Sequence, residues 1–406
     1  METTSQTLRS WIYEAGPAAL THVDHLLDKI INLFKDGGVQ KHNILILTTA
    51  AASIVALYLA AVRRLRYKNI NAIRAKYPNP QDVLDNIDIA REINAITTKK
   101  EFPFLSREGT ELALFKTFTI PTISRLLVAT GEFKKDCTRR AEDTELVLME
   151  ITDAHARIQK QVAKDPSTPE EDIKAQWQRS DMALKRLNEL HGKYNILNDD
   201  YLYTLSLFIY EPVSWINRYE WRSLDEREIN ALFRVWYDVG VGMNLQNIPD
   251  TPAKMLAFKN KYAEEHITYA SSNWKCGEPT FRHLLSNMPA FLREPMYSVG
   301  LHLLPSVLDS ADAKAFQLPE EHAILTAIFK SALHIRAFFI RHFMLPRSTY
   351  LSRTPFYPNK DGKFVPEFFY YKPHIYKDGY SISELGPDKF KSEQATGTTL
   401  KCPVMH

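Results

Sequence analysis

The sequence predicts an all-α protein with a single N-terminal transmembrane helix, a globular helical bundle and an extended C-terminal arm. Three observations support this fold class. Residues 43–62 contain no charged side chain, apolar residues recur at helical spacing through most of residues 101–347, and no stretch of alternating polar and apolar residues indicates a strand. With 406 residues, 45% of them hydrophobic and 24% charged, the chain is large enough to bury a substantial core.

The first 62 residues predict a membrane anchor. In residues 1–42 apolar side chains recur on one face of a helix, so we expect an amphipathic helix in this N-terminal segment. Residues 43–62 follow, and about twenty residues at roughly 1.5 Å each span a hydrocarbon core of roughly 30 Å. Lysines and arginines are denser after this segment than before it. The positive-inside rule therefore predicts a cytosolic body and a lumenal N-terminal segment.

Residues 63–100 are predicted to form a basic stalk that holds the body close to the bilayer. Its helix should break at Pro78 and Pro80, and an amphipathic helix should follow up to about Thr97. The helical body is then expected over residues 101–347.

The end of the body contains a second apolar stretch, residues 324–344. Five of its side chains are basic or imidazole groups, namely Lys330, His334, Arg336, Arg341 and His342. Because such groups are costly inside a bilayer, we expect a core helix whose basic edge faces solvent or lipid headgroups, and not a second span. Residues 348–406 then mix Pro, Gly and Lys with many Phe and Tyr. This aromatic content predicts an arm that wraps the body rather than a disordered tail.

Two histidines on apolar helix faces are the candidate functional residues. Arg140 and Thr144 are one helical turn apart, and the same face continues to His155. A second helix carries His191 on its apolar stripe. Such a histidine is either a core residue satisfied by its neighbours or a neutral imidazole that can ligate a haem iron. Spacing alone leaves both interpretations open.

A loop at residues 164–169 separates the two helices. Its Pro, Ser and Thr residues are typical of a break in a helical pattern. Thr168 followed three positions later by Glu171 predicts a capping box at the start of the second helix.

Several short blocks resemble successive blocks of one protein family. They are Leu112-Ala-Leu-Phe-Lys-Thr-Phe, Ile120-Pro-Thr-Ile-Ser, Thr130-Gly-Glu-Phe, Arg140-Ala-Glu-Asp-Thr144, Leu190-His191-Gly-Lys-Tyr, Asp200-Tyr-Leu-Tyr-Thr-Leu, Glu220-Trp-Arg-Ser-Leu, Tyr376-Lys-Asp-Gly-Tyr, Glu384-Leu-Gly-Pro and Lys401-Cys-Pro. Together they resemble the endoplasmic-reticulum-bound oxygenases typified by the enzyme of fungal mycophenolic acid biosynthesis. The catalytic domain of that family is distantly similar to bacterial rubber oxygenases, the latex clearing proteins.

The resemblance implies a function for the helical body. It implies a haem b cofactor, dioxygen as co-substrate, and cleavage of a double bond in the isoprenoid chain of a lipophilic metabolite in fungal secondary metabolism. It also implies an anchor in the endoplasmic reticulum membrane, with contact to membrane lipid and the catalytic domain in the cytosol.

The resemblance also assigns roles to individual residues. His191 takes the place of the proximal ligand of the haem iron, and Arg140 and Thr144 match an Arg and a Thr that border the haem. Asp143 stands where the bacterial enzymes can place a distal lysine, so the distal chemistry does not carry over. His155 lies eleven residues beyond Thr144, about 16 Å along a helix, which is too far for the same iron unless the helix bends.

The assignment of His191 as a haem ligand predicts a feature of the structure. His191 should lie inside the fold and border, together with Arg140, a cavity of porphyrin size. The opposing hypothesis is a haem-free helical membrane protein that binds or scaffolds a lipophilic partner, with both histidines structural.

Other function classes are disfavoured. A net charge of +3 and the lack of a basic stripe interleaved with aromatics argue against nucleic acid as a partner. Cys137, Cys276 and Cys402 are far apart, so no disulfide framework is expected, and Cys276 lacks the Phe-x-x-Gly frame of a thiolate-ligated haem. The sequence also lacks Glu-x-x-His pairs, a phosphate loop, a Gly-x-Ser-x-Gly elbow and a local set of zinc ligands.

Overall fold

The computed structural model describes residues 41–391. Regular structure in this range is helical, and a single bridge between Phe364 and Tyr380 is the β pairing found there. The all-α fold class is therefore confirmed. The expected amphipathic helix before residue 41 and the Lys401-Cys-Pro block lie outside the described residues. The chain divides into two compact units, Met1–Arg66 and Tyr67–His406.

The described part of the first unit is one helix, α3 (Lys41–Arg66). It is 26 residues long, and its last turn carries Arg63, Arg64 and Arg66. The helical stretch Leu45–Lys76 is long and apolar enough to cross a membrane. The predicted span at residues 43–62 thus lies in a helix of suitable length and composition.

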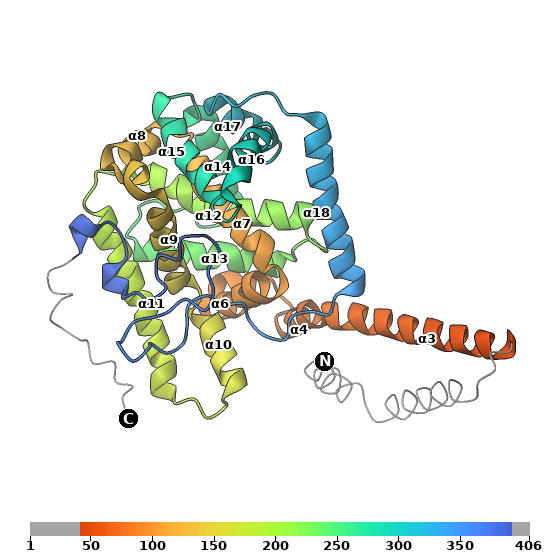
Figure 1. The fold of residues 1–406 in the computed structure, drawn as a ribbon. Coiled ribbons are helices and arrows are strands. Elements are labelled where there is room, and N and C mark those ends of the chain that lie inside the picture. Colours follow the sequence, from red (N-terminus) through yellow and green to blue (C-terminus); the bar gives the residue numbers. More distant parts are fainter. Residues whose placement is uncertain (1–40, 392–406) are drawn as a thin grey trace. The chain divides into compact units, whose positions relative to one another are not determined.

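The second unit is the helical body, shown in Figure 1. Its α-helices are α4 (Lys68–Lys76), α5 (Gln81–Asp85), α6 (Ile87–Ile96), α7 (Pro103–Thr117), α8 (Pro121–Thr130), α9 (Glu132–Thr152), α10 (Ala154–Lys164), α11 (Glu170–His191), α12 (Asn198–Tyr219), α13 (Glu226–Gly242), α14 (Pro252–His266), α15 (Ser271–Leu284), α16 (Ala290–Leu303), α17 (Ser310–Ala315) and α18 (Ala323–Phe343). Short turns of other helix types are η1 (Thr97–Glu101), η2 (Leu304–Ser306), η3 (Ile382–Glu384) and η4 (Asp388–Phe390).

Helix α12 forms the centre of the body, with α7, α13, α14 and α18 packed around it (Figure 1). Residues 205–213 of α12 are all buried, as expected for a helix covered on every side. Helix α7 crosses α12 so closely at Gly109 that an added Cβ would lie 2.6 Å from Cα of Pro212. Pro212 has no N–H, so the carbonyl of Phe208 loses its helical hydrogen bond. The central helix is therefore locally irregular at this crossing.

The segment predicted as a stalk belongs largely to the body. The helix breaks before Pro78 and Pro80 as predicted, since α4 ends at Lys76 and α5 begins at Gln81. Beyond the break, α6 packs on α13, where Ile93 and Val235 join one buried apolar cluster. Residues from Tyr67 onward therefore fold with the second unit.

His191 lies on the second predicted helix, α11, as expected, but His155 does not lie on the same helix as Arg140. The face predicted to run from Arg140 to His155 is interrupted, because α9 ends at Thr152 and α10 begins at Ala154. His155 therefore belongs to α10.

The loop between α10 and α11 forms as predicted, but the prediction of a capping box at the start of α11 is wrong. Pro169 occupies the N-cap of α11 without a side-chain cap bond. The hydroxyl of Thr168 instead donates to the carbonyl of Asp165 at 2.6 Å. Because that hydroxyl is engaged in the turn, it does not cap the helix.

Helix α18 is not a core helix, so that prediction is wrong. Thr326, Leu333 and Ala337 are buried, but the apolar side chains of the opposite face are exposed. The helix is long and apolar enough to cross a membrane, which makes it a second candidate span among the described residues. Helical periodicity predicts that residues 323–343 form a helix with one more apolar face. It does not predict whether that face packs on the body or is exposed.

After α18 the chain crosses the body with little regular structure, and we call residues 344–391 the arm (Figure 1). The arm is tied to helices from the middle of the sequence. Arg353 pairs with Glu145 at 3.0 Å, and the Tyr376 hydroxyl donates to the Asp143 carboxylate, so the arm contacts α9. Nε of Arg186 on α11 donates to the carbonyl of Leu385 at 3.0 Å. The arm therefore fixes α9 and α11 against each other.

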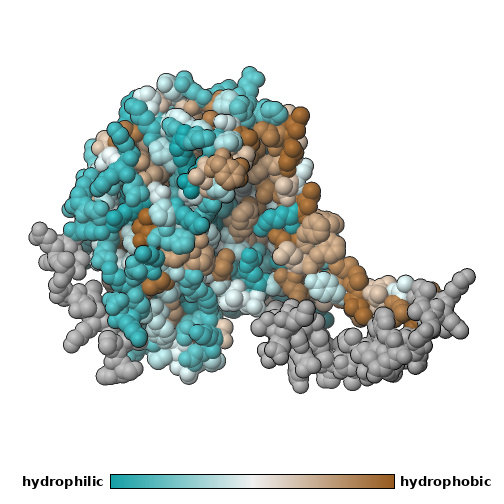
Figure 2. Space-filling view, in the orientation of Figure 1, coloured by the Kyte–Doolittle hydropathy of each residue, from teal (hydrophilic) through white to brown (hydrophobic). Residues whose placement is uncertain are grey.

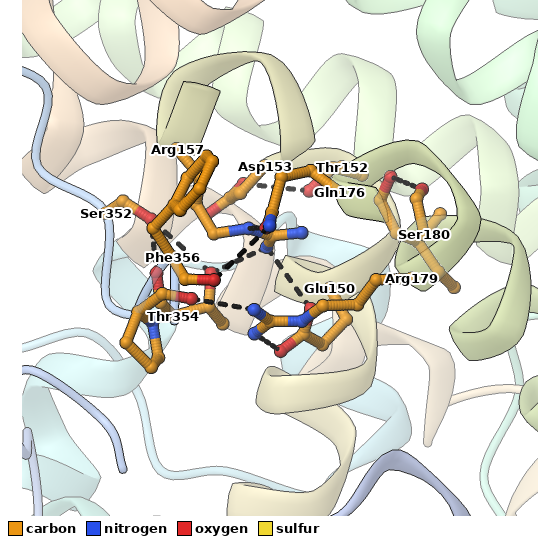
Figure 3. Close-up of polar contacts among 12 residues, drawn as sticks. Glu150, Thr152, Asp153, Arg157, Gln176, Arg179, Ser180, Ser352, Thr354 and Phe356 are labelled. Carbon is orange, nitrogen blue, oxygen red and sulfur yellow. Dashed lines mark hydrogen bonds and ion pairs between the residues drawn. The ribbon is translucent and has the colours of Figure 1, made fainter. Parts of the chain in front are cut away.

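A buried carboxylate, Glu150, joins three helices and the arm (Figure 3). It pairs with Arg157 of α10 at 3.2 Å and with Arg179 of α11, and it accepts a hydrogen bond from the Tyr380 hydroxyl. Burial alone would raise the pKa of Glu150, but the two guanidinium groups outweigh burial and hold this pKa below its usual value. Arg157 also donates to the Thr354 hydroxyl at 2.7 Å.

We predict that Glu150→Ala lowers the free energy of unfolding by about 3–5 kcal/mol, because it leaves two buried guanidinium groups without their carboxylate. The pKa of Glu150 is lower in the folded chain than in the unfolded chain. Its contribution to the free energy of unfolding is therefore fully present above the ordinary glutamate pKa, and it is lost as the pH falls through the pKa of the folded chain. Denaturant unfolding of the detergent-solubilised chain at pH 7 and at pH 3 would measure both effects.

The matched control is Glu170→Ala, since Glu170 pairs with Lys174 at the surface of α11. Exposed pairs contribute about 0–1 kcal/mol, so this variant should unfold almost like the parent. Equal losses for the two variants would contradict the role given to Glu150.

Candidate functional site

A large cavity lies in the body between α7, α9, α12, α15 and α18. Its volume is about 420 Å³, within the range of roughly 300–1,000 Å³ typical of small-molecule sites. Apolar side chains form most of its wall, among them Leu148 of α9, Phe208 and Trp215 of α12, and Leu333 of α18. Phe208 stacks on Trp236 with ring centroids 4.6 Å apart, which fixes this part of the wall. The cavity is suited to an apolar ligand.

One corner of the cavity is polar, and Arg107 is at its centre. The guanidinium group pairs with Glu108 at 3.0 Å, with Glu145 at 3.1 Å, and with Glu111. It also stacks on the ring of Tyr370, with 3.5 Å between Cζ and the ring centroid. These contacts hold a cation and three carboxylates at the cavity wall. We call Arg107, Glu108, Glu111 and Glu145, with Tyr370 and Tyr371, the polar corner.

The environment of the polar corner favours the protonated form of Glu111. Burial raises the pKa of Glu111 to about 8 against the opposing charge of Arg107, and the carboxylates of Glu108 and Glu145 add to the increase. The Tyr371 hydroxyl donates to Glu111 at 3.1 Å. Since three carboxylates surround one guanidinium group, Glu111 is available as a proton donor toward the cavity.

His283 of α15 also lines the cavity. Its Nδ1 lies 3.2 Å from the hydroxyl oxygen of Thr138, and its ring centroid lies 4.4 Å from that of Tyr371. Burial lowers the pKa of His283 to about 4, so the imidazole is neutral. It is the histidine in the wall of this cavity.

The candidate ligand His191 is the last residue of α11 and is half-buried. Its Nδ1 is inaccessible to solvent and has no hydrogen-bond partner among the described residues. Its ring lies 5.4 Å from that of Tyr201, centroid to centroid. Burial, with a smaller contribution from the positive charge of Arg140, lowers the pKa of His191 to about 4. The imidazole is therefore neutral and one nitrogen is unpartnered.

The other predicted site residues surround His191 only in part. Arg140 is near enough for its charge to act on His191, and its Nη1 lies 4.0 Å from a carboxylate oxygen of Asp143. Asp143 is buried and accepts the hydrogen bond from Tyr376 of the arm. The hydroxyl of Thr144 donates to the carbonyl of Arg140 at 2.8 Å, so it is engaged within its own helix.

The donor at residue 191 suits a haem iron, but the space beside it does not suit a porphyrin. A neutral imidazole with an unpartnered nitrogen has the right chemistry. The arm, however, fills the space near α9 and α11, where a Cβ added to Gly386 would lie 2.7 Å from Cδ1 of Leu190. The large cavity borders a different face of α9, that of Ala141, Leu148 and Thr152, and its wall does not include His191 or Arg140.

The competing histidine, His155, lies at a separate small cavity of about 60 Å³. Arg91, Trp177 and Asp238 are among the other residues of its wall. Burial lowers the pKa of His155, so its imidazole is also held toward the neutral form. The structure therefore places the two candidate histidines at different sites.

No protein-family model matches the chain. Individual fungal proteins do. The chain is 26% identical over 391 residues to the ER-bound oxygenase mpaB' of Penicillium brevicompactum, a match that covers 83% of this chain and 87% of that protein. It is 27% identical over 284 residues to the ER-bound oxygenase mpaB of Penicillium roqueforti strain FM164, covering 65% of this chain and 88% of the relative.

A third match, to the ER-bound oxygenase mpaB of Penicillium brevicompactum, is 32% identical over 197 residues and covers 47% of this chain and 46% of that protein. The chain is a relative of the ER-bound oxygenases. The family named from the short sequence blocks is thereby confirmed, and the more distant link to rubber oxygenases stays a prediction.

The polar corner of this relative of the ER-bound oxygenases could not be predicted from local sequence patterns. Arg107 and Glu111 have the i, i+4 spacing of an ordinary surface ion pair on a helix. Their partner Glu145 comes from α9 and the two tyrosines come from the arm, far away in the sequence. The local signal is therefore the same as that of a solvated helix face.

We predict that Glu111→Gln makes the stability of this ER-bound oxygenase relative less dependent on pH. Because the folded pKa of about 8 lies above the unfolded value, the folded chain binds more protons, and stability falls as pH rises from about 4.5 to about 8. The variant should remove this slope, which amounts to at most about 1.4 kcal/mol per pH unit. Denaturant unfolding at pH 5, 6.5 and 8 measures it.

The exposed Glu264 of α14 supplies the matched control, Glu264→Gln, which should keep the slope of the parent. A Glu111→Gln slope equal to that of the parent would show that Glu111 titrates normally.

Proposed function

We propose that this chain is a membrane-bound oxygenase that cleaves a double bond in the isoprenoid chain of a lipophilic metabolite in fungal secondary metabolism. The names of its relatives support oxygenase activity and a place at the endoplasmic reticulum. The structural observation that supports an apolar, isoprenoid substrate is the large apolar cavity of the body. In this proposal the chain is anchored by α3 and the body faces the cytosol.

The cavity wall fits an isoprenoid chain. Leu148, Phe208 and Leu333 offer apolar surface without hydrogen-bonding groups that would favour water over a hydrocarbon, and Trp215 adds an indole ring with a single N–H donor. Burial of an isoprenoid chain there removes apolar surface from water, which favours binding by roughly 25 cal/mol per Å² of apolar surface. The wall thus selects for apolar chains without specifying one.

The polar corner would orient the substrate. Arg107 is held by its carboxylates and by the ring of Tyr370, so this corner offers hydrogen-bonding groups in fixed positions to a polar substituent such as a phenol hydroxyl. The protonated Glu111 can donate a hydrogen bond toward the same position. A polar head at this corner would place the apolar chain along the rest of the cavity.

Haem b remains the proposed cofactor and dioxygen the proposed co-substrate. A bound haem would supply the activation of dioxygen, and neutral His191 would be its iron ligand, with Arg140 beside it. That arrangement requires the arm to leave the space near Gly386 and Asp143. No step of the reaction is therefore assigned to these residues.

The filled space at His191 favours a second candidate function. Without haem, the chain would be a helical membrane protein that binds or presents a lipophilic partner in the same cavity, with His191 as a core residue. Both candidates use the cavity, and they differ in whether the purified protein carries haem.

We predict that the chain, expressed with ample haem and purified in detergent, shows a Soret band that His191→Ala abolishes. The matched control is His155→Ala, which should keep the band because His155 lies at a different cavity. Absorption spectra with and without dithionite measure this. A band that survives His191→Ala would disprove the ligand assignment, and a colourless parent protein would favour the haem-free candidate.

We predict that Ala141→Phe lowers the activity toward a prenylated phenol by about tenfold or more in kcat/KM, equivalent to about 1.4 kcal/mol. Ala141 faces the cavity from α9, so a phenyl group fills space meant for the substrate without displacing a packed side chain. Product formation followed by mass spectrometry in detergent or vesicles gives the rates.

The control for this variant is Ala129→Phe, an exposed position on α8 that does not line the cavity. It should leave kcat/KM unchanged. Full activity of Ala141→Phe would mean that the substrate binds elsewhere.

A further inference from the structure

Helix α18 presents an apolar face outward along its whole length. The exposed apolar side chains of this face include Ile324 (66% exposed), Ile328 (61%), Ile335 (56%), Phe338 (53%) and Phe339 (51%). Figure 2 shows the same face as a band of hydrophobic surface along the edge of the body where α18 runs. Contiguous apolar surface of this kind marks an interaction site.

The basic side chains of α18 are arranged so that its outer face stays apolar. Lys330 pairs with Glu321 at 3.7 Å, and Arg336 pairs with Glu220 of the body at 3.0 Å. Thus Arg336 lies on the packed side of the helix, where it also covers the ring of Phe104. Arg341 and His342 are in the last turn, where basic side chains can reach lipid phosphates while the helix stays buried.

The packed side of α18 forms part of the cavity wall. Phe329 and Leu333 line the cavity from this helix. Phe104 of α7 and Leu284 of α15 also line the cavity, and they remain 43% and 37% exposed, so the cavity reaches the surface at these residues. Cζ of Arg336 lies 4.6 Å from the centroid of the Phe104 ring. One opening of the cavity is therefore next to α18.

We propose that α18 lies in the plane of a membrane surface with its outer apolar face in the lipid, and that the cavity behind it opens to the bilayer at Phe104. A full span is disfavoured, because one side of α18 packs on α12 and α16 and would take the pairs of Glu220 and Glu321 into hydrocarbon. A helix with one packed and one apolar face, and a basic end, is instead typical of insertion parallel to the bilayer plane.

Two observations favour lipid over a second copy of the chain as the occupant of this face. The same chain carries an apolar helix long enough to cross a membrane, and its relatives are named ER-bound. The basic end of α18, with Arg341 and Arg347, complements anionic headgroups.

The first experiment measures depth in lipid. The full chain, with Cys137 and Cys402 changed to Ser, receives Phe338→Cys, is labelled with an environment-sensitive nitrobenzoxadiazole dye and is reconstituted into phosphatidylcholine vesicles with one fifth phosphatidylinositol. We expect blue-shifted emission and strong quenching by nitroxide-labelled lipid. Phe338 is largely exposed, so this change leaves the core of the body intact.

The matched control carries the label at Lys261→Cys, an exposed position of α14 whose side chain is 75% accessible. It should show neither the blue shift nor the quenching. Equal quenching at the two positions would overturn the proposal. A blue shift at Phe338→Cys without quenching by lipid nitroxide would also overturn it and would identify a second protein copy as the occupant.

The second experiment tests the opening and rests on the proposed function of the cavity. Radiolabelled farnesol in vesicles serves as the probe, and a bulky maleimide on Phe104→Cys should lower its binding by about tenfold or more, whereas the same label on Lys261→Cys should not. If the unlabelled chain binds no farnesol, the proposed substrate class fails while the lipid contact of α18 stands on the first experiment. If the chain binds farnesol and the label at Phe104→Cys has no effect, the opening is elsewhere.

Discussion

The buried carboxylate of Glu150 is the constraint on which the arrangement of the body depends. An unpaired charge in the interior is costly, so Glu150 has to be met by cations and donors, and these come from three separate parts of the chain. Arg157 comes from α10 and Arg179 from α11, as Figure 3 shows. Tyr380 comes from the arm. Satisfying this one carboxylate fixes the rotation of α9. With α9 so fixed, one of its faces lines the cavity and another meets the arm.

The helical class and the principal helices could be predicted from sequence, because helical periodicity and proline breaks are local signals. The failures concern properties that periodicity does not contain. The exposed apolar face of α18 looks the same in sequence as a buried one, and the Thr168 cap was lost to a competing turn with Asp165. The polar corner was missed because Glu145 meets Arg107 only after two distant helices have packed.

The candidate site shows how family blocks and geometry inform each other. The blocks named the family, and in the structure several of them make contacts between distant segments. Thr122 of one block donates to Asp200 of another at 2.8 Å, and the Tyr376 hydroxyl of a third block donates to the Asp143 carboxylate of a fourth. Such blocks identify relatives because they hold the body together. They do not by themselves locate the chemistry, and the cavity wall draws mostly on residues outside them, such as Arg107, Trp215 and His283.

The arm has a consequence for how the protein is made. Arg353, Tyr370 and Tyr371 complete the cavity wall, and Tyr380 completes the shell of Glu150, yet all four follow α7 to α18 in the order in which a ribosome adds them. While α7 to α18 emerge, the Arg107 cluster lacks its aromatic cover and Glu150 lacks one of its donors. The nascent body therefore has an open interior that lacks part of its packing and hydrogen bonding, and this interior is a natural target for chaperones until the arm has been added.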